Sequence, residues 1–87
     1  MEKVYVVIGE SGEYDSYYKW SIVAYLDRGK AEEHKRNANN RGKEITDLVF
    51  NQGYDHDSLS NEYDPDMLDN MEYNGTTYSI EEVELKK

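Results

Sequence analysis

The stretch KVYVVIG, residues 3–9, decides the fold. Its residues are almost all β-branched or aromatic, and no polar residue interrupts the run after Lys3. Such a composition is typical of a β-strand that lies centrally in a sheet or is covered on both faces. The run is far too short for the core of a signal peptide or for a membrane span. We therefore predict a central strand with a neighbouring strand on each side.

A second strand is predicted directly after this one. Residues 10–17 are polar and include Gly12, as expected of a hairpin loop longer than a two-residue turn. The stretch YKWSIVAYL, residues 18–26, then alternates between two faces. The alternation predicts that one face is buried. That face carries Tyr18, Trp20, Ile22 and Ala24.

One long helix is predicted over residues 28–51. Asp27 stands at the N-cap position, where its carboxylate can accept hydrogen bonds from the first turn. Ala31, Ala38 and Ile45 recur every seven residues and form an apolar stripe. Gly42 weakens a helix by about 1 kcal/mol relative to alanine, so a break there is the alternative.

The last third of the chain predicts a loop followed by a strand. Residues 52–70 lack periodicity and contain Gly53 and Pro65, so we expect an acidic loop there. Asn74-Gly75 favours a type I′ turn, and residues 76–85 follow as a strand. A short fourth strand before Asn74 is left open. The chain is thus predicted to be a single α+β domain, residues 1–87, in the order β-β-α-β, with an antiparallel-type sheet ordered 2-1-3 and one helix on one face.

Charge is distributed unevenly along the chain. The net charge is −9, and residues 44–85 contain twelve acidic residues and no lysine or arginine. An acidic face can simply keep a protein soluble. It can also imitate nucleic acid and dock into a basic groove of a partner protein. On that hypothesis the partner-binding residues are Asp55, Asp57, Glu62, Tyr63, Asp64, Asp66, Asp69 and Glu72, the tyrosine being an aromatic anchor.

Three motifs carry a resemblance to a known group of proteins. They are E-x-G-E-Y at residues 10–14, K-A-E-E at residues 30–33 and G-T-x-Y-x-I-E-E-V at residues 75–83. With them the chain resembles a family of small uncharacterised proteins encoded by phages and prophages. The resemblance implies an accessory protein that inhibits a host defence protein, as anti-CRISPR proteins do. It implies no catalytic residue.

Two other functions remain open. The chain can be an assembly module that forms a homodimer through an exposed sheet edge. It can also bind a metal through Asp55-His56-Asp57 or Asp64-Pro65-Asp66, but a calcium loop that starts at Asp55 has Leu59 and Ser60 where an oxygen ligand and a glycine belong. We expect no enzyme, no cofactor, and no direct binding to nucleic acid or membrane. The absence of cysteine fits a reducing compartment, so we expect a cytoplasmic protein.

Overall fold

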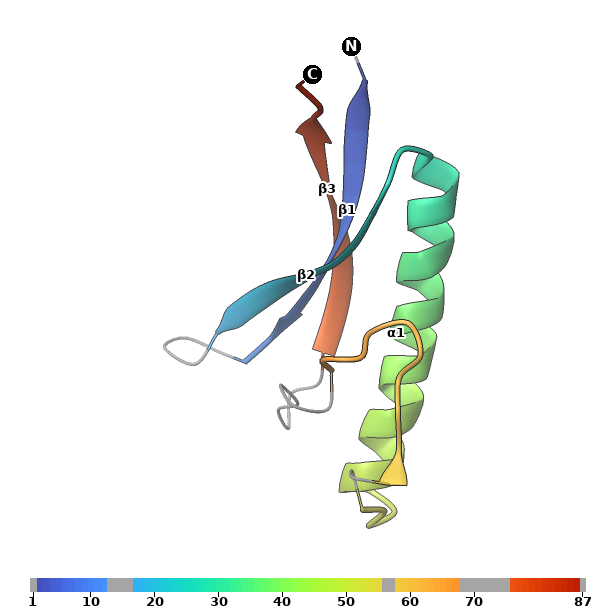
Figure 1. The fold of residues 1–87 in the computed structure, drawn as a ribbon. Helices are drawn as coiled ribbons and strands as arrows, with labels where there is room; N and C mark the ends of the chain where they lie inside the picture. Colours follow the sequence, from blue (N-terminus) through green and yellow to red (C-terminus); the bar gives the residue numbers. More distant parts are fainter. Residues whose placement is uncertain (1, 13–16, 56–57, 68–75, 87) are drawn as a thin grey trace.

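The protein folds as three strands and one helix (Figure 1). The structure is a computed structural model that describes residues 2–12, 17–55, 58–67 and 76–86. The elements are β1 (Lys3–Ser11), β2 (Tyr18–Tyr25), α1 (Arg28–Phe50) and β3 (Thr76–Glu84). The sheet is ordered β2-β1-β3, and both outer strands run antiparallel to β1. The predicted α+β fold, its element order and its central first strand are confirmed.

Helix α1 supplies one half of the core. Ala31, Ala38 and Ile45 are all fully buried, which confirms the predicted stripe, and Val7 of the central strand is fully buried as well. The helix runs without a break through Gly42, which is itself buried. The alternative of a break at this glycine is wrong, since tertiary packing outweighs its poor helix propensity.

The start of α1 is fixed as the sequence predicts. The Asp27 carboxylate accepts hydrogen bonds from the backbone N–H groups of Gly29 at 2.7 Å and Lys30 at 3.3 Å. These bonds satisfy two of the N–H groups that have no partner within the helix. At the other end, Asn51 is the first residue after the helix, and its backbone N–H donates to the carbonyl of Asp47.

Strand β2 departs from the predicted alternation because it contains a bulge. Val7 pairs with Val23, but the next residue of β1, Ile8, pairs with Ser21, so Ile22 is an extra residue. A bulge of this kind shifts the alternation by one position. Residues from Val23 onward therefore change faces, and Ala24 is exposed instead of buried. Of the predicted buried face, Trp20 is half-buried on the helix side and Ile22 is half-buried at the bulge, whereas Tyr18 is 36% exposed.

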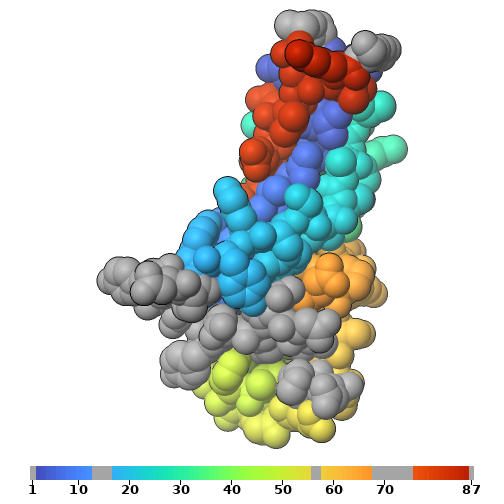
Figure 2. Space-filling model, turned by 60° about the vertical axis from the view of Figure 1, so that its left-hand side comes forward, coloured from blue at the N-terminus to red at the C-terminus, as the bar shows by residue number. Residues whose placement is uncertain are grey.

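The sheet has one covered and one open face. Figure 2 shows β3, β1 and β2 side by side over the upper half of the face turned away from α1, with no helix in front of them. Val83 and Leu85 are 44% and 36% exposed. The covered face therefore contains the packed core that stabilises the fold, and the open face is accessible for contacts with other molecules.

The predicted loop holds no α-helix or strand where the structure describes it, in residues 52–55 and 58–67; Ser58 belongs to a 3₁₀ turn in which its N–H donates to the carbonyl of Asp55. The turn at Asn74-Gly75 and the optional fourth strand lie outside the described residues. Among those that are described, no helix is both long and apolar enough to cross a membrane.

Candidate protein-binding site

The acidic loop is fastened to the core by one of its carboxylates. We call residues 58–67 the strap. Asp64, in its middle, is only 1% exposed. Its carboxylate accepts a hydrogen bond from Trp20 Nε1 of β2, at 3.0 Å from Oδ2, and another from the Tyr78 hydroxyl of β3 at 2.7 Å. Asp64 therefore ties the strap to both outer strands, and its predicted role as a surface contact to a partner is corrected to a structural one.

The hydroxyl of Tyr78 is held in its neutral form by this arrangement. Burial raises the pKa of Tyr78 well above its ordinary value of 10, and the hydrogen bond to Asp64 raises it further. Both causes act in the same direction because a phenolate would be poorly solvated and would lie against a carboxylate. Tyr78 is therefore a hydrogen-bond donor throughout the physiological pH range.

Two further strap residues fill the core beside Asp64. Met67 is fully buried and Asn61 is 3% exposed. The Asn61 amide donates to Met67 Sδ at 3.3 Å, and its oxygen accepts from the Tyr63 backbone N–H at 2.9 Å. From the helix, Arg41 Nε donates to the carbonyl of Ser60 at 3.1 Å. The strap is consequently a packed element and not only a connection.

His34 joins three elements. Its Nε2 donates to the carbonyl of Tyr63 at 2.7 Å, because a carbonyl can only accept, and its Nδ1 lies 3.0 Å from the Tyr25 hydroxyl. In the neutral ring Nδ1 is then the acceptor, so the hydroxyl donates to it. The Tyr63 ring meets the imidazole edge-on, with ring centroids 5.8 Å apart. Tyr63, the predicted aromatic anchor, is half-buried and already packs within the molecule.

The other predicted binding residues divide into two groups. Asp55, Glu62 and Asp66 are exposed, as a surface role requires. Asp57, Asp69 and Glu72 lie outside the described residues.

The described, exposed carboxylates of the strap side and those of β3 form two groups instead of one continuous face. Asp55, Glu62 and Asp66 belong to the strap and the residues before it, which lie beside the second half of α1 (Figure 1). Glu81, Glu82 and Glu84 lie at the far end of β3, close to the N-terminus (Figure 1). Acidic residues that are close in the sequence are thus divided in space, because the last strand carries its acids away from the strap.

Basic residues neutralise a part of this charge. Arg41 forms an ion pair with Glu44, and Lys3 Nζ lies 3.2 Å from a Glu82 carboxylate oxygen. Both partners of the second pair are about half exposed, with side chains 52% and 45% accessible. Exposed pairs of this kind contribute little to stability, and each offsets the charge of one carboxylate.

The outer edge of β3 is partly occupied by a side chain from the helix. The Tyr78 backbone N–H donates to Asn39 Oδ1 at 3.0 Å, and Asn39 Nδ2 donates to the Tyr78 carbonyl at 3.4 Å. The Asn39 amide thus makes both bonds that a neighbouring strand would make. The role of Asn39 is not predictable from the sequence, because a polar residue on a helix gives no sign that its side chain binds a strand 39 residues further along the chain.

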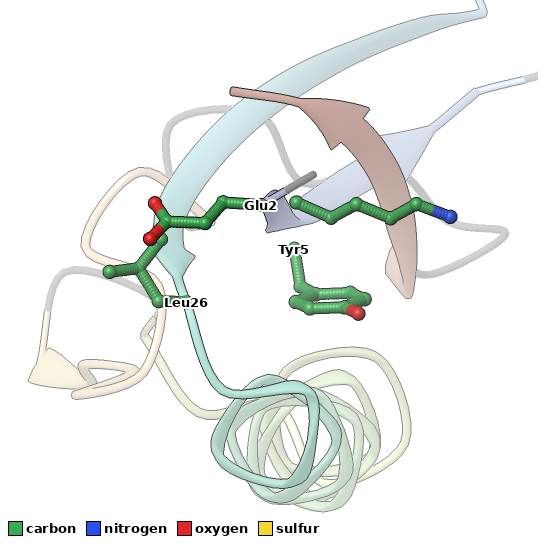
Figure 3. Close-up of a pocket in the computed structure, with 4 residues that line it drawn as sticks. Glu2, Tyr5 and Leu26 are labelled. Atoms are coloured by element: carbon green, nitrogen blue, oxygen red, sulfur yellow. The ribbon is translucent and has the colours of Figure 1, made fainter. Parts of the chain in front are cut away.

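A shallow hollow of about 310 Å³ lies at the start of β1, where the sheet diverges from α1. It is lined by Glu2, Lys3, Tyr5 and Leu26. Figure 3 shows Tyr5 pointing from β1 toward α1, while Glu2 extends toward Leu26. The hollow contains one acid and one base and no convergent set of polar groups, so it favours no particular ligand.

Within the described part of the chain, no group of three or more histidine, aspartate or glutamate side chains is placed to hold a metal ion. Asp57 and His56 of the first metal candidate lie outside that part. No protein-family model, curated protein or solved structure matches the chain. The resemblance to phage and prophage proteins therefore stays a prediction.

Proposed function

We propose that the protein is a binding module that docks through its exposed carboxylates onto a basic, nucleic-acid-binding surface of a partner protein and so keeps nucleic acid away. One observation supports this proposal. All but one of the described carboxylates in residues 44–85 are exposed, and no lysine or arginine accompanies them in that part of the sequence. Those on α1 and on the strap side, which we expect to face the partner, are Glu44, Asp47, Asp55, Glu62 and Asp66; Glu81, Glu82 and Glu84 lie apart from them on β3.

The physical basis is charge complementarity with a rigid presentation. A groove that binds nucleic acid is lined with cations spaced for phosphates, and it attracts other dense negative charge in the same way. Glu62 and Asp66 flank the buried Asp64, so the strap that carries them is already ordered. An ordered surface loses less conformational entropy on binding than a mobile one.

A competition assay tests the proposal. The resemblance to phage proteins makes a DNA-binding host defence nuclease the first partner to try. Labelled duplex DNA is bound to the purified nuclease, and its displacement by this protein is followed by fluorescence anisotropy. We expect displacement that weakens steeply as salt is added, since charge contacts are screened.

A matched pair of variants identifies the contributing charges. Glu62→Lys reverses a strap carboxylate, and Glu33→Lys makes the same change of charge on the exposed surface of α1. We expect the first variant to displace DNA about tenfold less well and the second to act nearly as the parent does. The proposal fails if no displacement occurs, if displacement is indifferent to salt, or if both variants weaken it equally.

A further inference from the structure

We propose that the outer edge of β3 from Ile80 to Glu84 binds an extended segment of a partner protein as a fourth strand, and that this segment alternates basic and apolar residues. The surface is distinct from the strap. The inference goes beyond the proposed function because it assigns a second contact with its own chemistry.

The backbone of β3 presents unpaired groups along this edge. In an antiparallel ladder, alternate residues direct both their N–H and C=O groups to the same side. Leu85 donates to the Glu2 carbonyl, so odd-numbered residues face β1, and the bonds from Asn39 to Tyr78 show that even-numbered residues face outward. Ile80, Glu82 and Glu84 therefore point their backbone groups away from the sheet. These groups have no partner among the residues that the structure describes.

The Asn39 amide fixes where an added strand must end. It occupies the edge at Tyr78 and leaves the backbone groups of the even-numbered residues beyond it open. In strand addition to such an edge, main-chain bonds give affinity and side chains give specificity.

The side chains on either side of the edge define the partner. Glu82 and Glu84 project to the helix side of the sheet, where Glu82 pairs with Tyr5 of β1 in the register and also forms the exposed ion pair with Lys3. Val83 and Leu85 project to the open face and are substantially exposed. An added strand places alternate side chains beside each set. A strand with lysine or arginine on one side and apolar residues on the other fits both.

A second copy of the chain fits this edge poorly. Antiparallel pairing that uses all three outward residues sets Glu82 opposite Glu82 of the other copy. Like charges directly opposite one another destabilise a sheet, and glutamates on an edge strand protect against self-association. The occupant we infer is therefore a different, basic chain.

The test uses a short peptide of alternating lysine and valine. Amide hydrogen exchange of the ¹⁵N-labelled protein is measured by NMR with and without saturating peptide. We expect exchange at Ile80, Glu82 and Glu84 to slow by about tenfold or more, while the Tyr78 amide, already bonded to Asn39, changes little. A peptide of the same composition with lysines and valines in two blocks is expected to give no such protection.

Two variants separate backbone pairing from simple attraction. Glu82→Pro removes an outward N–H without removing a bond to β1, and edge strands tolerate proline in that position. It is expected to abolish the protection. A double variant with Glu82→Lys and Glu84→Lys is expected to prefer a peptide of alternating glutamate and valine. A second double variant, Asp55→Lys with Glu62→Lys, makes an equal change of charge on the strap side. It is expected to keep the protection by the lysine peptide.

The inference is overturned if the alternating peptide, whether it binds or not, leaves the exchange of these three amides unchanged, if the block peptide protects them equally, or if they become protected by concentration-dependent dimerisation without peptide. None of these outcomes depends on the nuclease assay. The two proposals can therefore fail separately.

Discussion

The strap and the far end of β3 are both rich in carboxylates, yet the two regions use them in opposite ways. Asp64 of the strap is turned inward, where it receives hydrogen bonds from Trp20 and Tyr78. Glu84 of β3 is exposed, and the ion pair described in this region joins Lys3 to Glu82. The difference lies in the number of donors that the fold brings to each carboxylate. Acidic residues that look alike in a sequence can thus be structural in one place and available for binding in another.

The largest effect is expected when the inward carboxylate is removed. Asp64→Ala leaves the Trp20 N–H and the Tyr78 hydroxyl without their acceptor. Hydrogen bonds to a charged group contribute about 1.5 to 3 kcal/mol each, so we expect the free energy of unfolding to fall by about 3 kcal/mol or more. Urea denaturation followed by circular dichroism measures the change.

The outward carboxylate gives the control for this experiment. Glu84→Ala is expected to change the free energy of unfolding by less than about 0.5 kcal/mol, as exposed substitutions usually do. Equal losses in the two variants would show that the contrast between strap and β3 is wrong.

A smaller loss of stability is expected when a side chain added at Gly9 crowds Trp20, which donates to Asp64. A Cβ atom added at Gly9 would lie 2.6 to 2.8 Å from atoms of the Trp20 ring. Gly9→Ala must therefore displace the indole, and overpacking of this kind costs about 2 kcal/mol. Because Trp20 is the sole tryptophan, its fluorescence reports the displacement directly. Ser21→Ala, an exposed change on the same strand, is expected to leave emission and stability unaltered.

Removing the second donor gives an effect that depends on pH. Tyr78→Phe should lower the free energy of unfolding by about 1 to 2 kcal/mol near neutral pH. The folded protein holds the Tyr78 pKa above 10, whereas the unfolded chain releases this proton near pH 10. The contribution is therefore complete below pH 10 and is lost as the pH rises above it.

Urea denaturation at about pH 8 and about pH 11 checks this sign. The loss caused by Tyr78→Phe is expected to be about 1.4 kcal/mol smaller at the higher pH, because the variant lacks the group that destabilises the parent there. Tyr54→Phe, at a side chain that is 52% exposed, should show no such change. A difference that grows with pH would contradict the environment we assign to Tyr78.

Local patterns predict this fold well, and long-range contacts explain the errors. The spacing of Ala31, Ala38 and Ile45 and the cap at Asp27 are encoded within a few turns of chain, so the helix was predictable. The extra residue at Ile22 was not, since a bulge arises from pairing with another strand. The sequence around Asp64 predicts a surface position, because the donors that hold its carboxylate inward lie 44 and 14 residues away. Burial of a carboxylate depends on such partners and not on its neighbours in sequence.

The smallest effect we predict is a gain in stability at the contact between α1 and the strap. A Cβ atom at Gly42 would meet Tyr78 at 3.5 Å and Met67 at 3.7 Å, which are ordinary packing distances. Gly42→Ala also improves helix propensity and restricts the unfolded chain, so we expect about 1 kcal/mol of added stability, seen as a higher urea midpoint. A loss instead would mean that the strap packs on the helix too tightly to admit one methyl group. The packing between α1 and the strap would then be more rigid, in comparison with the open end of β3, than these contact distances indicate.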